Sequence, residues 1–322
     1  MLRRALLSAA TASAMLAAPA LQAQTFSQTV RIIVPVAPGG TSDIMARLIA
    51  PVLSARIGPN VVVENRAGAG GNIGADFVAK SRPDGHTILL LDVSILATNP
   101  ALYARMPFDA ERDLAPVQML IYAPYILVVN NDLPVRNAAE LVAYARANPG
   151  RLNAANAGTG TLGQIVALSL AASWGTEVMS VSYRGGAPAM MSLVSNEANL
   201  SMSGVTLSLP FVQRGQMRGI AVTGPRRLDV VPDLPTFREL GWPEHDAGTW
   251  QGVMVQGQTP RPMVERLERE IAAVLGEPLI RTRIAELGAE VVADGADAFR
   301  RRLSEQTASY GKVIRDNSLR AE

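Results

Sequence analysis

An apolar run that ends in a glycine turn is the segment that most constrains the fold of this chain. Residues 31–36 are rich in β-branched side chains, which favour a strand, and the run stops at Pro38, Gly39 and Gly40. A segment with helical spacing follows, and its apolar face carries Ile44, Leu48, Val52 and Leu53. The first backbone N–H groups of such a helix lack partners within it, and the helix dipole favours negative charge there. The segment therefore predicts a strand, a tight loop and a helix N-terminus suited to a small anion.

The same alternation of short strands and helices continues along the chain. Further strands are predicted at 60–65, 86–92, 125–130, 152–156, 177–183, 200–204, 219–223 and 250–255. Helical patterns are predicted at 138–147, 164–174, 262–275, 278–287 and 296–315. Short strands that alternate with helices are typical of a parallel sheet covered on both faces, so the expected fold class is α/β.

The length of 322 residues is sufficient for two domains. We expect residues 24–124 together with 250–322 to form domain 1 and residues 125–249 to form domain 2, each with a mostly parallel sheet. The chain would then cross between the domains twice, along the strands near 125–130 and 250–255, and leave a hinged cleft between them. In open sheets of this kind, ligands bind beyond the carboxyl ends of the strands.

The N-terminus predicts export through a signal peptide over residues 1–23. Two arginines come first, residues 5–18 are small and apolar, and a small-residue cleavage site follows near Ala20 or Ala23. A membrane anchor is the alternative, but the apolar stretch is shorter than the ~20 residues that span a bilayer. Cysteine is absent, which excludes disulfides and thiolate chemistry. The expected location is the periplasm, and a net charge of +2 with scattered basic residues predicts no nucleic-acid partner.

Three loops share one design, in which a strand is followed by glycine with a hydroxyl or proline and then by a helix. They are residues 38–43, 158–164 and 183–188. One interpretation is that their N–H groups, with the hydroxyls of Thr41, Ser42, Thr159 and Thr161, hold carboxylate oxygens from two sides. The other is that they are ordinary turns with helix caps.

Catalysis and cofactor binding find less support in the sequence. Gly68, Gly70 and the later Asp92 imitate a dinucleotide fingerprint, but Ile73 stands where that pattern has its third glycine, so close packing of a helix on the sheet is the other reading. Only His86 and His245 could serve a triad, and no G-x-S-x-G elbow or metal-ligand spacing is present. We therefore expect no catalytic residue, no cofactor and no metal.

Several motifs together resemble the successive signatures of the Bug/TctC family of extracytoplasmic receptors of tripartite tricarboxylate transporters. The motifs lie at 35–43, 62–74, 83–85, 99–103, 147–150, 183–188 and 221–223 and cover essentially the whole mature chain. The resemblance implies a two-domain periplasmic binding protein of type II that closes like a Venus flytrap on a small organic carboxylate. It also implies delivery of the ligand to integral-membrane permease subunits, by a protein that we expect to be a monomer. A secreted α/β enzyme and a ligand-sensing subunit of a signalling system are the alternatives.

Matching this chain to the family residue by residue gives a candidate ligand site. It comprises Val36, Pro38, Gly39, Gly40, Thr41, Ser42, Asp43, Ser94, Gly158, Thr159, Gly160, Thr161, Gln164, Tyr183, Gly186, Ala187, Pro188 and Ser203. The chain departs from the family pattern at Val36, at Gln164, at Ser203 and in the segment 92–96, which we expect to be a loop. Backbone anion sites would survive these changes, whereas Ile95 and Leu96 suggest a ligand with an apolar portion.

Overall fold

The computed structural model describes residues 26–242, 247–316 and 320–321. The predicted signal peptide and His245 lie outside these ranges. Within them, no helix is both long and apolar enough to cross a membrane. The same residues contain no group of three or more acidic or histidine side chains that could hold a metal ion.

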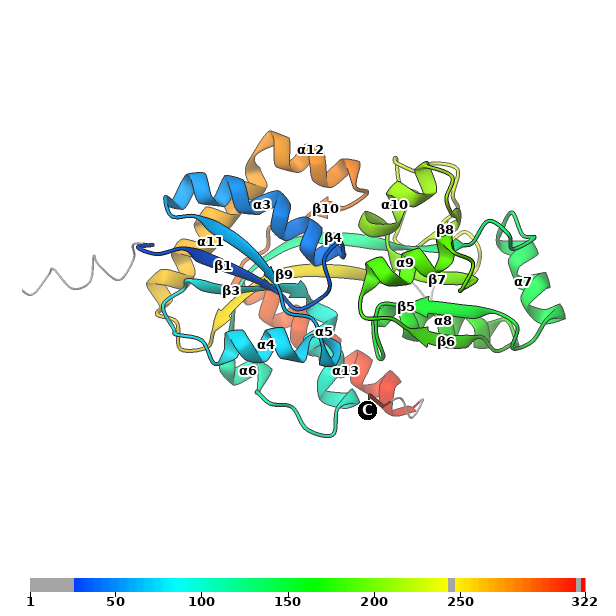
Figure 1. The fold of residues 1–322 in the computed structure, drawn as a ribbon, viewed down its shortest axis with the longest axis horizontal. Helices are drawn as coiled ribbons and strands as arrows, with labels where there is room; N and C mark the ends of the chain where they lie inside the picture. The colour runs from blue at the N-terminus through cyan, green and yellow to red at the C-terminus, as the bar shows by residue number, and fades with distance from the viewer. Residues whose placement is uncertain (1–25, 243–246, 317–319, 322) are drawn as a thin grey trace, which may run out of the picture.

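Two lobes make up the described chain, joined by long strands that run from one lobe into the other (Figure 1). The strands of the first lobe are β1 (Val30–Val34), β2 (Val61–Asn65) and β3 (Thr87–Asp92). Its helices are α3 (Thr41–Ile57), α4 (Asn72–Ala79), α5 (Val93–Leu102), α6 (Ala110–Asp113), α11 (Arg261–Gly276), α12 (Pro278–Glu286) and α13 (Ala296–Asp316). The second lobe contains strands β5 (Asn153–Asn156), β6 (Met179–Ser182), β7 (Leu200–Gly204) and β8 (Arg218–Val222) with helices α7 (Ala138–Ala147), α8 (Leu162–Ser173), α9 (Gly186–Val194) and α10 (Val205–Gln213).

Strands β4 (Leu114–Val129) and β9 (Gly248–Gln256) connect the lobes through one curled, mixed sheet. The strand order is β2-β1-β3-β9-β4-β7-β5-β6, with β8 and β10 (Glu290–Val291) also paired to β4. Parallel pairing joins β2, β1 and β3 in the first lobe and β7, β5 and β6 in the second. Antiparallel pairing joins β4 to β9, β7, β8 and β10. The first half of β4 thus belongs to one lobe and its second half to the other.

Helix α3 shows how the predicted amphipathic pattern is used. Its most buried apolar side chains are Met45, Ala46, Ile49 and Leu53, against the sheet of the first lobe. The buried face of the helix is rotated slightly from the predicted one, since Ile44, Leu48 and Val52 are only half-buried at the edge of that core. The N-terminus of the helix nevertheless points where the sequence placed it, at the end of β1.

The α/β fold and the elements with clear periodicity are confirmed, and three expectations need correction. A mostly parallel sheet was expected in each domain, but the described strands form one mixed sheet, because β4 and β9 run between the lobes and pair antiparallel with their neighbours. Segment 92–96 was expected to be a loop, but it begins α5, because the Asp92 side chain accepts a hydrogen bond from the Ser94 N–H and caps the helix. The strand predicted at 125–130 is the C-terminal end of β4. The preceding part of β4 includes Pro116, Gln118 and Pro124, which interrupt the pattern that predicts a strand.

Candidate functional site

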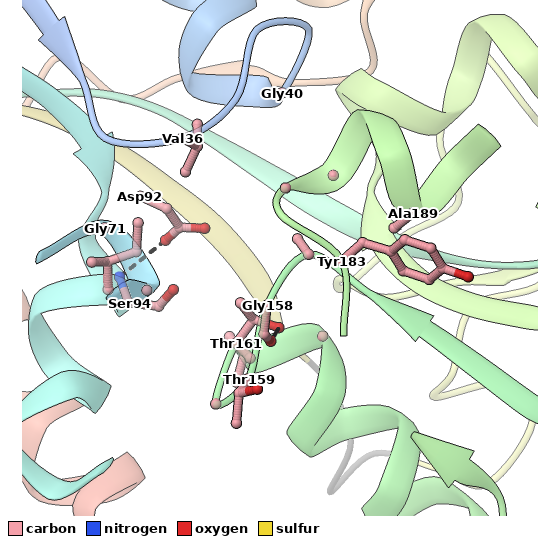
Figure 2. A pocket seen from close by; sticks show the side chains of 18 of the residues that line it. Val36, Gly40, Gly71, Asp92, Ser94, Gly158, Thr159, Thr161, Tyr183 and Ala189 are labelled. Carbon is pink, nitrogen blue, oxygen red and sulfur yellow. Dashed lines mark hydrogen bonds between the residues drawn. The ribbon is translucent and has the colours of Figure 1, made fainter. Parts of the chain in front are cut away.

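A cavity of about 950 Å³ lies between the two lobes and is lined by loops from both (Figure 2). The structure places many of the sequence-predicted site residues on its wall: Val36, Gly40, Thr41, Ser42, Ser94, Gly158, Thr159, Gly160, Thr161, Tyr183, Gly186 and Ser203. The remaining predicted residues do not line it: Pro38, Gly39, Asp43, Gln164, Ala187 and Pro188. The segments that the sequence separated by more than a hundred residues therefore meet around one space.

Six helices of the described chain begin at this cavity. The residues that precede their first turns all line its wall, and they are Gly40 of α3, Gly71 of α4, Asp92 of α5, Thr161 of α8, Gly185 of α9 and Gly204 of α10. Only Asp92 caps its helix with a side chain. The first N–H groups of a helix have no partners within it, and five of these helices begin at the cavity without a side-chain cap, with the positive ends of their dipoles there. In α4 one such group, the Ile73 N–H, bonds to the Gly68 carbonyl at 3.5 Å. Both lobes contribute such ends.

The loop between β1 and α3 is held in shape by Asp43. This buried carboxylate accepts hydrogen bonds from the Gly39 N–H at 2.9 Å, from Asn65 at 2.9 Å and from Arg47 at 3.0 Å. Burial alone would raise the pKa of Asp43, but these hydrogen bonds outweigh burial and lower the pKa below its ordinary value. The geometry therefore gives Asp43 a bracing function behind the loop, and the carboxylate faces its donors rather than the cavity.

Gly39 and Ala187 lie where the two lobes touch beside the cavity. A Cβ atom built on Gly39 would lie 3.3 Å from the Cβ of Ala187, and Gly39 has a φ of 84°, which favours glycine. On another side, a Cβ on Gly160 would lie only 1.9 Å from the Cδ1 of Leu102 in the first lobe. Small residues thus let the lobes approach closely around the cavity.

In the second lobe, side chains fix the loop before α8 from within. The Thr161 hydroxyl donates to the Gly158 carbonyl at 2.9 Å, and Gln164 Oε1 accepts from the Gly160 N–H at 2.6 Å. Gln164 Nε2 donates to the Ser180 hydroxyl at 2.6 Å, so this side chain is fully engaged behind the loop. The sequence had predicted that Gln164 and the Thr161 hydroxyl contact a ligand. In this structure the protein uses their donors, and it also uses the N–H groups of Gly160 and Thr161, which bond to Gln164 Oε1 and to the Gly158 carbonyl.

A chain of buried hydrogen bonds crosses the floor of the cavity in the first lobe. Ser42 Oγ donates to Gln251 Oε1 at 2.7 Å, Gln251 Nε2 donates to the Thr249 hydroxyl at 2.7 Å, and that hydroxyl donates to Asp92 Oδ2 at 2.5 Å. Asp92 Oδ1 accepts from the Ser94 N–H at 3.0 Å. Burial raises the pKa of Asp92 and outweighs the opposing hydrogen bonds.

Sequence reasoning missed part of the wall. Thr249 and Gln251 come from β9, which pairs with the end of β3 and so places Gln251 opposite Asp92. No local pattern marked them, because only the antiparallel crossing of β9 brings them here. The segment Gly68–Gly71, weighed as a nucleotide motif, lines the cavity as well, and Asn99 supports it by donating to the Gly70 carbonyl at 3.1 Å.

Apolar groups also reach the wall. Ile95 and Tyr103 line the cavity from the side of α5, and Ile73 lines it from α4. Leu96, the other residue that suggested an apolar ligand portion, is buried in the core of the first lobe and does not face the cavity. Of the two residues that suggested an apolar ligand portion, Ile95 therefore lines the cavity and Leu96 does not.

Two lobes around a cavity ringed by helix N-termini define the class of two-domain solute-binding proteins. The chain belongs to the tripartite tricarboxylate transporter family of receptors, whose model, TctC, matches residues 45–319. It is 36% identical to a protein from the tcbD-tcbE intergenic region of Pseudomonas sp. (strain P51), over 92% of this chain and 88% of that one. It is 32% identical to the protein BugT of Bordetella pertussis, over 96% of this chain and 95% of that one.

Solved structures of the family have the same fold. The periplasmic binding protein BugD superposes with a TM-score of 0.87 at 30% identity, over 92% of this chain and all of that one. The R. palustris protein Rpa4515 with adipate gives a TM-score of 0.88 at 32% identity, over 91% of this chain and 98% of that one. MatC of Rhodopseudomonas palustris with bound malate gives a TM-score of 0.83 at 29% identity, over 89% of this chain and 99% of that one. The predicted family and the two-domain fold are thereby confirmed.

Proposed function

We propose that this protein is a periplasmic receptor that captures a small organic carboxylate between its lobes and delivers it to the permease of a tripartite tricarboxylate transporter. The observation that carries the proposal is the convergence of six helix N-termini on one cavity, five of them without a side-chain cap. Uncapped N–H groups and dipole ends are the features that bind carboxylates without a charged side chain. Family relatives were solved with adipate and with malate, which supports the same ligand class here.

The proposed mechanism divides the ligand contacts between the lobes. The turn before α3 and the turns before α8 and α9 would hold the ligand from opposite sides, so that it binds the closed arrangement of the lobes more tightly than an open one. The proposed domain boundaries follow the same division. Residues 24–124 with 250–322 form one domain and residues 125–249 the other, and β4 and β9 cross between them. The receptor acts as a monomer without catalytic activity, after removal of residues 1–23.

A thermal shift assay against mono- and dicarboxylates tests this function. A ligand present at 100 times its Kd stabilises the folded protein by about 2.7 kcal/mol, which raises the melting temperature measurably. We expect stabilisation by at least one small carboxylate and none by neutral sugars or alcohols of similar size. Failure of every carboxylate in a broad panel would contradict the proposal.

A further inference from the structure

Asp92 is the only acidic residue on the described wall of the cavity. Two arginines also reach the wall, Arg184 and Arg320, but both are exposed to solvent, whereas Asp92 is half-buried at the end of β3. Figure 2 shows its carboxylate directed into the space between the lobes. A cavity built from helix N-termini to receive an anion thus contains one interior negative charge.

The hydrogen bonds define what Asp92 can offer a ligand. The Thr249 hydroxyl already accepts from Gln251, so its proton is free for Asp92 Oδ2, and the Ser94 N–H serves Oδ1. Asp92 is therefore the terminal acceptor of a chain of donors that starts at Ser42. The Ser94 hydroxyl and the Trp250 N–H also act on this carboxylate, so what Asp92 offers a ligand while it is ionised is a negative charge that accepts hydrogen bonds and has no proton to donate.

The structural task of Asp92 does not require its charge. Asparagine caps a helix about as well as aspartate, and its side-chain oxygen could accept the same bond from the Ser94 N–H. The charge does matter to a ligand, because a second carboxylate beside Asp92 would be repelled in this partly desolvated site, whereas a cation would be attracted. Helix capping therefore does not explain why residue 92 carries a negative charge.

We propose that Asp92 is a specificity-determining residue that selects carboxylic acids bearing a second group that donates hydrogen bonds, an ammonium above all, and rejects a second carboxylate at that end. This inference rests on the proposed receptor function. The helix N-termini hold the carboxylate of the ligand, and Asp92 accepts from its donor group. The ligand class is that of amino acids and related amino carboxylates, with hydroxy acids binding more weakly through the same acceptor.

Calorimetric titration with straight-chain acids of matched length provides the test. The acids end in ammonium, hydroxyl, methyl or carboxylate, and several chain lengths are compared on the wild type and on Asp92→Asn, which retains the cap. Asp109→Asn is the matched control, because Asp109 caps α6 through the Glu111 and Arg112 N–H groups and lies exposed outside the cavity wall. It removes the same charge from the same type of position.

We expect the wild type and Asp109→Asn to prefer the ammonium acid over the dicarboxylate by at least about tenfold, the scale of one close charge interaction. Asp92→Asn should reduce that ratio by about tenfold while still binding the acids. The selectivity ratio separates this function from a structural one, since a general weakening of the site would lower all affinities together. A wild type that binds the dicarboxylate as tightly as the ammonium acid, or an unchanged ratio in Asp92→Asn, would overturn the inference and leave the receptor function standing. Binding of no acid at all would overturn both.

Discussion

Replacement of Gly40 by aspartate should stabilise the empty protein and block ligand binding at once. Gly40 precedes α3 with φ −75° and ψ 166°, the extended conformation of an N-cap, and no side chain caps this helix. A Cβ atom added there would meet Val36 Cγ2 at 3.5 Å and the Ala37 carbonyl at 3.6 Å, which are ordinary contacts. The new carboxylate can therefore reach the same N–H groups that we assign to the ligand.

The structure sets the expected magnitudes. Exchanging glycine for aspartate at an N-cap is worth a few tenths of a kcal/mol, and the negative charge near the helix dipole adds about 0.3–1 kcal/mol. The melting temperature of the unliganded protein should rise by roughly 1–4 °C. Loss of two hydrogen bonds to a charged ligand, each worth about 1.5–3 kcal/mol, should weaken binding by about two to four powers of ten.

Melting curves and calorimetric titration with the best acid from the carboxylate panel measure both effects. Gly40→Asn is the matched control, since it caps the helix without a charge and should weaken binding less than Gly40→Asp. The equivalent change at Gly39 would be uninformative, because its positive φ and its contact with Ala187 would disturb the fold as well. A Gly40→Asp protein that is more stable but retains wild-type affinity would refute the assignment of this helix end to the ligand.

Three further predictions concern stability and closure. The pKa of Asp43 is lowered from 3.8, so the stability that its charge contributes is complete above pH 3.8 and is lost as the pH falls through the folded-state pKa. Asp43→Asn should therefore lower the melting temperature at pH 7 by an amount equivalent to about 1–2 kcal/mol, and the difference from the wild type should shrink in acid. A difference that does not change with pH would contradict this. The pKa of Asp92 is raised instead, so the stability of the wild type should increase as the pH falls toward 3.8. Asp92→Asn should melt at a higher temperature than the wild type near neutral pH, and the melting temperatures of the two proteins should converge in acid. Gly160→Ala would bring a methyl group against Leu102, and Gly160 has a φ of 76°, which disfavours alanine. The ligand-bound variant should therefore have a larger radius of gyration in small-angle scattering than the ligand-bound wild type. An identical radius would refute the close contact between the lobes.

Local patterns predicted much of the fold because each element matched its period. The segments 200–204 and 138–147 coincide with β7 and α7, whose apolar spacing is regular and whose ends carry clear signals. Helix α10 gave no such signal, because Pro210 stands inside it. The part of β4 before Tyr125 was missed for a similar reason, since its prolines and its buried Gln118 read as irregular chain.

The site was predictable where it depends on backbone and unpredictable where it depends on tertiary contacts. Glycine and hydroxyl residues after a strand marked the turns at Gly40, Gly158 and Gly186, all of which line the cavity. Nothing local showed that Gln164 would turn behind its loop to bind Ser180. Nor could spacing show that Thr249, 157 residues from Asp92, would donate to that carboxylate, because the contact depends on the antiparallel pairing of β3 with β9.

The most direct test of the account is a calorimetric comparison of one carboxylic acid with its primary amide, using the acid that stabilises the purified protein best. The pair has nearly the same shape and differs in charge, so it isolates the contribution of the helix N-termini. Hydrogen bonds to a charged group exceed those to a neutral one by about 1 kcal/mol or more each, so the acid should bind at least about a hundredfold more tightly than the amide. An amide that binds as tightly as the acid would contradict the claim that this cavity is built to hold a carboxylate.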